Sequence, residues 1–105
     1  MLKVIFTFRR REDLTWEEFR RHAEERHAPL VTQLPGLRRY VQSLVTPDSA
    51  DRPFDGIAQV WYDDESAYRR SFESEPGQAV IADAANYADP TSETEIFVED
   101  VAVFP

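Results

Sequence analysis

The sequence contains no cysteine, only three glycines and no long apolar run. Without cysteine, a disulfide framework, a thiolate metal site and a cysteine nucleophile are all excluded. No segment has the run of about eighteen apolar residues that a membrane-spanning helix needs, and the N-terminus lacks the basic and apolar regions of a signal peptide. We therefore expect a cytoplasmic protein with no membrane partner.

Positive charge is scarce in the second part of the chain. Residues 1–40 carry nine Lys and Arg against six Asp and Glu, whereas residues 41–105 carry three against fourteen, and the net charge is −8. Nucleic-acid binding depends on basic side chains that neutralise phosphates. An acidic chain with only short arginine clusters supplies few such contacts, so we expect no nucleic-acid partner.

The length of 105 residues is that of one compact domain. A chain of this size buries roughly two thirds of the surface that its unfolded form exposes. One hydrophobic core can therefore hold it together without cross-links, and we expect a single domain over residues 1–105.

Hydrophobic periodicity predicts a strand and then a capped helix. Residues 2–9 alternate with the period of two that is typical of a strand. Thr15 and Glu18 form a capping box, which predicts that a helix begins there. The inward stripe of this helix is Phe19, Ala23, His27, Leu30 and Leu34. Pro29 lacks an amide proton, so we expect a kink or a short second helix near Ala28.

The rest of the chain predicts three more strands and a second helical region. The strands are expected at residues 37–45, 56–62 and 95–104. A polar loop over residues 46–55 joins the first two of them. Asp63 or Asp64 caps a helix, and a further helical segment over residues 78–87 follows it.

This order of elements is that of the ferredoxin-like α+β fold, βαββαβ, in which a four-stranded antiparallel sheet carries its helices on one face. Several strands are apolar on both faces, so Ile5, Tyr40 and Trp61 need a cover. A second copy of the chain is the simplest cover, because a two-fold interface needs only one self-complementary patch. We therefore expect a homodimer that buries sheet against sheet.

Residues 14–42 resemble the signature of the EthD family, within the dimeric α+β barrel superfamily. The resemblance rests on the run His27-Ala28-Pro29-Leu30, on Leu34-Pro35-Gly36-Leu37 followed by Tyr40, and on an acidic pair before Phe19. It implies ferredoxin-like protomers that dimerise through their sheets, with a pocket between sheet and helices in each. It implies neither a metal ion nor an organic cofactor.

The resemblance also implies a range of activities. The family includes a protein encoded with an alkyl ether degradation system, isomerases of methyl-substituted muconolactones and fungal polyketide dehydratases. The superfamily adds cofactor-independent monooxygenases and polyketide cyclases. Their shared chemistry is the removal of a proton from an activated carbon acid on a small aromatic, lactone or polyketide-like substrate.

His27 and Tyr40 are the candidate catalytic residues. An imidazole takes up and returns a proton near neutral pH, and a phenol donates a hydrogen bond to a carbonyl or an enolate. Both residues also fit a second interpretation, as core residues with satisfied hydrogen bonds. The resemblance favours the catalytic interpretation, because the matching histidine and tyrosine belong to the active site of lactone isomerase relatives. A cysteine implicated there has no counterpart in this chain.

Other residues are candidates for contacts with a substrate. The aromatic candidates for a substrate pocket are Trp61, Tyr62, Phe72 and Tyr87. Arg9 and Arg38 are the cations considered for an anionic substrate, although no motif singles either out. His22 and His27 are five residues apart, about 140° on a regular helix, so we expect no shared metal site and place His22 at the surface.

Three hypotheses follow. The first is a cofactor-independent isomerase, dehydratase or cyclase in which His27 is the general acid and base and Tyr40 holds the carbonyl oxygen. The second is a monooxygenase that inserts oxygen into an electron-rich phenol without a cofactor. The third is a dimeric binding or accessory module for a hydrophobic metabolite or a partner oxygenase. The lack of cofactor-binding motifs fits all three.

Overall fold

The computed structural model describes residues 1–48 and 51–105, so Ser49 and Ala50 of the predicted polar loop lie outside the described residues. In chain order, its elements are β1 (Leu2–Phe8), α1 (Trp16–His22), the π-helical segment η1 (Ala23–His27), α2 (Ala28–Val31), β2 (Arg39–Leu44), β3 (Gly56–Tyr62), α3 (Glu65–Glu73), α4 (Glu75–Ala84) and β4 (Thr94–Val98). The predicted α+β class is confirmed.

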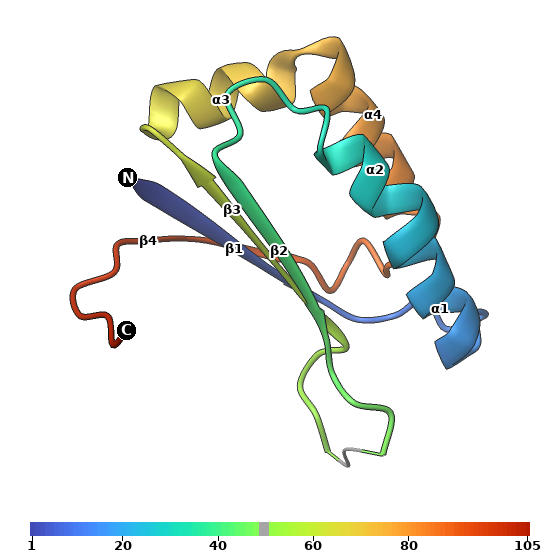
Figure 1. The fold of residues 1–105 in the computed structure, drawn as a ribbon. Coiled ribbons are helices and arrows are strands. Elements are labelled where there is room, and N and C mark those ends of the chain that lie inside the picture. The colour runs from blue at the N-terminus through green and yellow to red at the C-terminus, as the bar shows by residue number, and fades with distance from the viewer. Residues whose placement is uncertain (49–50) are drawn as a thin grey trace.

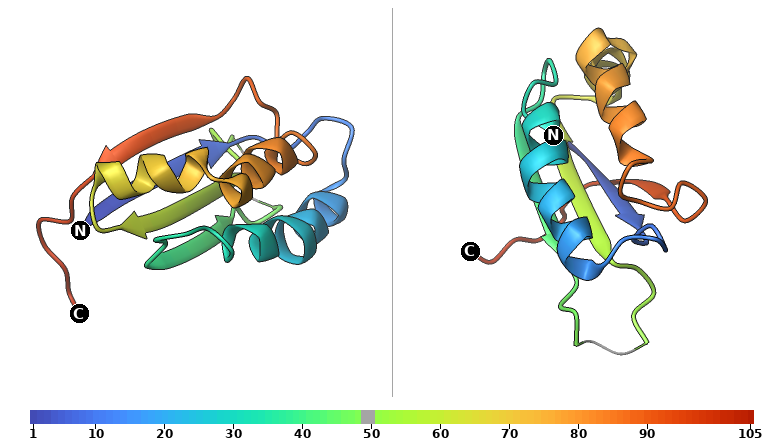
Figure 2. Two further views of the ribbon diagram at one scale, coloured as in Figure 1. Left: turned by 90° about the horizontal axis from the view of Figure 1, so that it is seen from above. Right: turned by 90° about the vertical axis from the view of Figure 1, so that its right-hand side faces the viewer.

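The four strands form one antiparallel sheet in the order β2-β3-β1-β4. The helices gather on one face of this sheet, and the other face is open (Figure 1). In the second view of Figure 2, α1, α2 and α4 lie in front of the strands. The predicted ferredoxin-like arrangement is therefore confirmed. No helix within the described part of the chain is long and apolar enough to cross a membrane.

The first helix begins as predicted and then widens into a π turn. The Glu18 amide donates to Thr15 Oγ1 at 3.1 Å and the Thr15 amide donates to Glu18 Oε1 at 2.9 Å, which confirms the capping box. Farther along, the Ala28 amide donates to the Ala23 carbonyl, five residues back. Pro29 has no amide to donate and stands in the first turn of α2. The predicted second helical segment is thus confirmed, with a π turn before it.

Two predicted boundaries are wrong. The helix expected over residues 78–87 is α4, which begins earlier because Ser74 caps it by accepting a hydrogen bond from the Gly77 amide at 3.2 Å. The strand expected over residues 95–104 is the shorter β4, and the chain beyond it runs away from the sheet (Figure 1). The side chains of Val101 and Phe104 are 96% and 100% exposed.

The core lies between the sheet and the helices. One group of buried side chains joins Phe8 and Phe19 to Tyr87, with the Phe8 and Tyr87 ring centroids 5.6 Å apart. A second group surrounds Val4 and Tyr62. The third joins α2 to α4, and its buried members are Val31, Leu34 and Val80.

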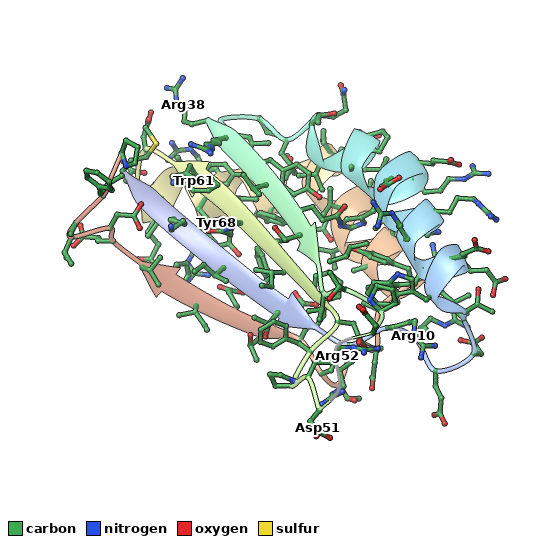
Figure 3. All side chains as sticks on the ribbon, turned by 60° about the horizontal axis from the view of Figure 1, so that its bottom comes forward. Arg10, Arg38, Asp51, Arg52, Trp61 and Tyr68 are labelled. Carbon is green, nitrogen blue, oxygen red and sulfur yellow. The ribbon has the colours of Figure 1, made fainter. Side chains whose placement is uncertain are left out.

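Tyr40 does not lie on the open face of the sheet, where the sequence had placed it. Tyr40 pairs with Val60 and packs among side chains of the helical layer, so the expectation that it needs a second sheet as cover is wrong. Trp61 does lie on the open face of β3, viewed in Figure 3. The ammonium of Lys3 and the guanidinium of Arg39 lie 5.2 and 4.9 Å from the centroid of its ring.

Candidate active site

A cavity of about 170 Å³ lies between the sheet and the helical layer. Side chains of β1, β2, β3, η1, α2, α3 and α4 line it, together with the residues at the start of β4. Most of the lining is apolar. Its polar and titratable members are His27, Tyr40, Tyr68, Tyr87, Glu93 and Glu95. Such a mixture, an apolar hollow with a few convergent polar groups, is typical of a small-molecule site.

His27 is held in the cavity wall by a carboxylate. Its Nδ1 lies 2.8 Å from Asp83 Oδ2, and its ring centroid lies 4.8 Å from that of Tyr87. The side chain is nearly buried. When Nδ1 carries the proton and donates to Asp83, the lone pair of a neutral ring is on Nε2. Within residues 1–48 and 51–105, no hydrogen bond occupies that nitrogen.

Asp83 also binds His22, which the sequence had placed at the surface. His22 Nε2 lies 3.0 Å from each carboxylate oxygen, and the Asn86 amide donates to Oδ1 at 3.1 Å. The surface prediction holds only in part, because the His22 side chain is 22% exposed and also contacts Asp83. The contact arises because η1 separates the two histidines. In a π turn the hydrogen bonds span five residues, so side chains five apart lie near the same face rather than about 140° apart.

Burial and the carboxylate act in opposite directions on His27. Burial lowers the pKa of His27 more than the hydrogen bond and negative charge of Asp83 raise it, so the pKa lies below its ordinary value. Burial acts to raise the pKa of Asp83, but hydrogen bonds from Asn86, His27 and His22 outweigh it and keep that pKa low. Near neutral pH the pair is therefore a neutral imidazole beside a carboxylate.

Tyr40 brings an unpaired hydroxyl to the same cavity. The hydroxyl oxygen is buried and has no hydrogen-bond partner in the described part of the chain. Burial raises the pKa of Tyr40 well above its usual range, so the phenol keeps its proton. A buried donor without an acceptor is costly, and an oxygen atom of a bound molecule would relieve that cost.

The structure separates the four aromatic residues that the sequence suggested for the pocket. Phe72 and Tyr87 line the cavity. Trp61 lies on the opposite face of the sheet, because its neighbour Tyr62 is the one that turns inward. Tyr62 is fully buried in the core, where its hydroxyl and the Ser71 hydroxyl form a hydrogen bond of 2.8 Å. Neither Trp61 nor Tyr62 is among the lining residues.

Sequence reasoning missed Asp83, Tyr68, Glu93 and Glu95. Asp83 is 56 residues from His27 along the chain, and no motif connects the two. The one available signal was that Asp83 falls within a predicted helix. A carboxylate on the buried side of a helix needs a hydrogen-bond partner. Across residues 1–48 and 51–105, no group of three or more His, Asp or Glu is arranged to hold a metal ion.

Comparison with known proteins places the chain among relatives of little-known function. It is 28% identical over 88 residues to an uncharacterized 11.0 kDa protein from the thcB-thcC intergenic region of Rhodococcus erythropolis, which covers 83% of this chain and 84% of the relative. A crystal structure of an EthD family protein from Bacillus halodurans matches with a TM-score of 0.80 and 26% identity, over 96% of this chain and 99% of that one.

Two more distant structures share the fold. A dimeric ferredoxin-like protein of unknown function from Thermobifida fusca matches with a TM-score of 0.74 and 16% identity, over 92% of this chain and 88% of that one. SnoaB, a cofactor-independent oxygenase from Streptomyces nogalater, matches with a TM-score of 0.70 and 14% identity, over 99% and 96% of the two chains. The EthD domain model matches residues 11–91, most of the chain, and the protein therefore belongs to the EthD family.

Proposed function

We propose that this protein is a cofactor-independent enzyme that transfers a proton on a small, mainly apolar substrate, with His27 as general base and then general acid. The observation that carries the proposal is the pairing of His27 Nδ1 with the Asp83 carboxylate at 2.8 Å in the wall of an apolar cavity. This pairing fixes the tautomer that leaves Nε2 basic, which is what abstraction of a proton from carbon requires.

The proposed reaction begins with the removal of a proton from carbon. His27 Nε2 takes a proton from a carbon next to a carbonyl, the C–H electron pair forms a carbon–carbon double bond, and the π pair of the carbonyl moves to its oxygen to give an enolate. The Asp83 carboxylate stabilises the imidazolium that results, and the Tyr40 hydroxyl donates a hydrogen bond to the enolate oxygen. The charge pair forms without any change in the net charge of the site.

The fate of the enolate then defines the reaction. In isomerisation, His27 returns the proton to a different carbon. In dehydration, the electron pair expels a hydroxyl group, which takes the proton and leaves as water. In cyclisation, the enolate carbon attacks a second carbonyl, and the new alkoxide takes the proton. All three need the same base and the same hydrogen-bond donor, so the proposal covers this class of chemistry.

We further propose that the enzyme is a homodimer that buries sheet against sheet. The open face of the sheet is rich in apolar side chains, and its apolar members are Ile5, Val41, Ile57, Trp61, Ile96 and Val98. Ile96 is 46% exposed, and Val101 and Phe104 beyond β4 have no cover in the single chain. Exposed apolar surface of this kind marks an interface, and structural neighbours are described as dimeric.

The proposal is tested by titrating the histidine rings by NMR from about pH 5 to pH 9, with and without a set of neutral lactones and aromatic ketones. The His27→Gln variant assigns the His27 signal and keeps a hydrogen-bond donor for Asp83. We expect the His27 signal to titrate below the pH of a free histidine and to shift when a ligand binds. A ring that responds neither to pH nor to any ligand would favour a core role.

A further inference from the structure

We propose that the cavity selects electrically neutral ligands and rejects carboxylates, and that Glu93 and Glu95 determine this specificity. The inference deepens the proposed function, on which it rests, by naming the charge class of the substrate. It follows from the residues that line the cavity: two glutamates are among them, and no lysine or arginine is.

The two glutamates reach the cavity from its β4 side. Glu95 pairs with Phe6 across the sheet and therefore shares the helix-facing side of the strand with the buried residues of β1. Glu93 directly precedes β4. Both glutamates are exposed to solvent where they line the cavity. Partial burial, and secondly the charge of Glu95, raises the pKa of Glu93, so the two carboxylates act on each other. Both also face Tyr68 of α3, whose pKa is raised by burial and then by these charges.

The nearby cations have other partners. The charge of Arg69 acts on Tyr68, but the Arg69 Nη2 lies 3.1 Å from Glu65 Oε1 and its guanidinium lies 5.6 Å from the centroid of Phe97. It does not belong to the cavity lining. No arginine of the cavity lining therefore neutralises the charges of the two glutamates toward a ligand.

The arginines suggested by the sequence for an anionic substrate do not reach the site. Arg38 is exposed and holds Asp63 with two hydrogen bonds of 3.0 and 2.8 Å, and it projects into solvent from one end of the sheet (Figure 3). Arg9 is exposed, and its Nη2 donates to the Arg52 carbonyl at 3.4 Å. Neither lines the cavity. His27 is the basic group that does, and near neutral pH its ring is neutral beside the Asp83 carboxylate, so it offers a ligand no positive charge.

A carboxylate ligand would therefore add a third negative charge to an apolar hollow. It would lose its hydration in the apolar cavity without gaining a cation, and the two glutamate charges at the solvent-exposed side of the cavity would repel it. A neutral lactone, ester or ketone avoids both costs, and a hydroxyl group on it can donate to Glu93 or Glu95. The enolate of the proposed reaction is permitted because it forms together with the His27 imidazolium.

The test compares each methyl ester with its acid, which differ in charge and by one methyl group, and the glutamate variants below separate the two effects. The pairs are methyl benzoate with benzoate, and methyl 4-hydroxyphenylacetate with 4-hydroxyphenylacetate, and binding is followed at neutral pH through the methyl NMR signals of Val80, Ala84 and Ala88 in the cavity wall. We expect each ester to bind at least about tenfold more tightly than its acid, which corresponds to about 1.4 kcal/mol.

Two double variants assign that preference to the glutamates. Glu93→Gln with Glu95→Gln should reduce it to about threefold or less, because the repulsion is removed while the side-chain shape is kept. Glu73→Gln with Glu99→Gln makes the same change of net charge at exposed positions outside the cavity, and it should keep the full preference. This control separates a local effect from the overall charge of the protein.

Three outcomes would overturn the inference. Equal binding of ester and acid to the unaltered protein would remove the charge selection and leave the proposed proton-transfer function standing. A full preference retained without Glu93 and Glu95 would remove these two residues as its cause. Failure of every probe, neutral or charged, to move the cavity signals would count against both the inference and the proposed function.

Discussion

At the scale of single residues, the carboxylate of Asp83 connects two histidines that are five positions apart in the chain. It lies 2.8 Å from His27 Nδ1 and 3.0 Å from His22 Nε2. A carboxylate in this position orients the imidazole and stabilises its protonated form. In the proposed reaction, Asp83 is thus a positioning residue for His27.

The pH dependence of His27 tests this role. Asp83 raises the pKa of His27 against the lowering effect of burial, so replacing Asp83 with Asn should lower the pKa of His27 further. The His27 ring would then gain its proton only at a lower pH, which an NMR titration measures directly. Asp89→Asn, an exposed aspartate that hydrogen-bonds Thr91 instead, is the matched control. An unchanged or higher pKa in Asp83→Asn would contradict the role.

The residues of the site were predictable to different degrees. His27 stood out because few side chains carry proton-transfer chemistry and it fell on the inward stripe of a predicted helix. Tyr40 was named for its phenol and for its match to the family, although the sequence had placed it on the other face of the sheet. Asp83 and His22 did not stand out, since their meeting depends on a π turn and on the packing of two distant helices. Glu93 and Glu95 were missed for a different reason: acidic residues in or beside an edge strand are normally solvated, and both are exposed here although they line the cavity.

At the scale of elements, α3 and α4 meet at a contact that only glycine permits. A Cβ atom on Gly77 would lie 2.3 Å from the Ser71 carbonyl oxygen and 2.5 Å from Phe72 Cα. These are backbone atoms, so they cannot move aside as the end of a flexible side chain can. Because Phe72 lines the cavity and α4 carries Asp83, this contact also sets one wall of the site.

We therefore expect the Gly77→Ala variant to be less stable than the original protein. Helix propensity alone would make alanine more stable than glycine by up to about 1 kcal/mol. The clash should instead reduce the free energy of unfolding by about 1–3 kcal/mol, measured by urea denaturation. Ala79 is exposed on the same helix, so the Ala79→Gly variant measures the effect of helix propensity alone. A Gly77→Ala protein more stable than the original would contradict the close contact.

The elements themselves were largely predictable from the sequence. Alternation in β1 and the capping box at Thr15 are local signals, and both gave correct element positions. The π turn was not predictable, because the inward stripe of the first helix fits a regular period. The last strand was predicted too long because the apolar residues after Val98 are typical of a strand, although no strand among residues 1–48 and 51–105 pairs with them.

At the scale of the whole molecule, the open face of the sheet is the surface that we propose a second copy of the chain covers. Ile96 in β4 tests this directly, since it is 46% exposed and pairs with Ile5 on that face. A lysine there is tolerated on a solvated sheet but is costly inside an apolar interface. Light scattering of the unaltered protein should give twice the 12.2 kDa of one chain, and Ile96→Lys should shift the mass toward one chain.

The control for this change is a lysine in place of exposed Ala82 on α4, which should leave the mass of the dimer unchanged. A single-chain mass for the unaltered protein at micromolar concentration would contradict the interface. So would an Ile96→Lys protein that keeps the full dimer mass while its NMR spectrum stays that of the folded chain.

The most direct test of the central claim is the exchange of carbon-bound protons for deuterium. Neutral lactones and cyclic ketones are incubated with the protein in D₂O, and the loss of their α-proton signals is followed by NMR. If His27 is the base, the unaltered protein should accelerate exchange of at least one compound about a hundredfold over buffer. The His27→Gln variant, folded and dimeric, should fall to the buffer rate. Equal exchange rates with the two proteins would contradict the account.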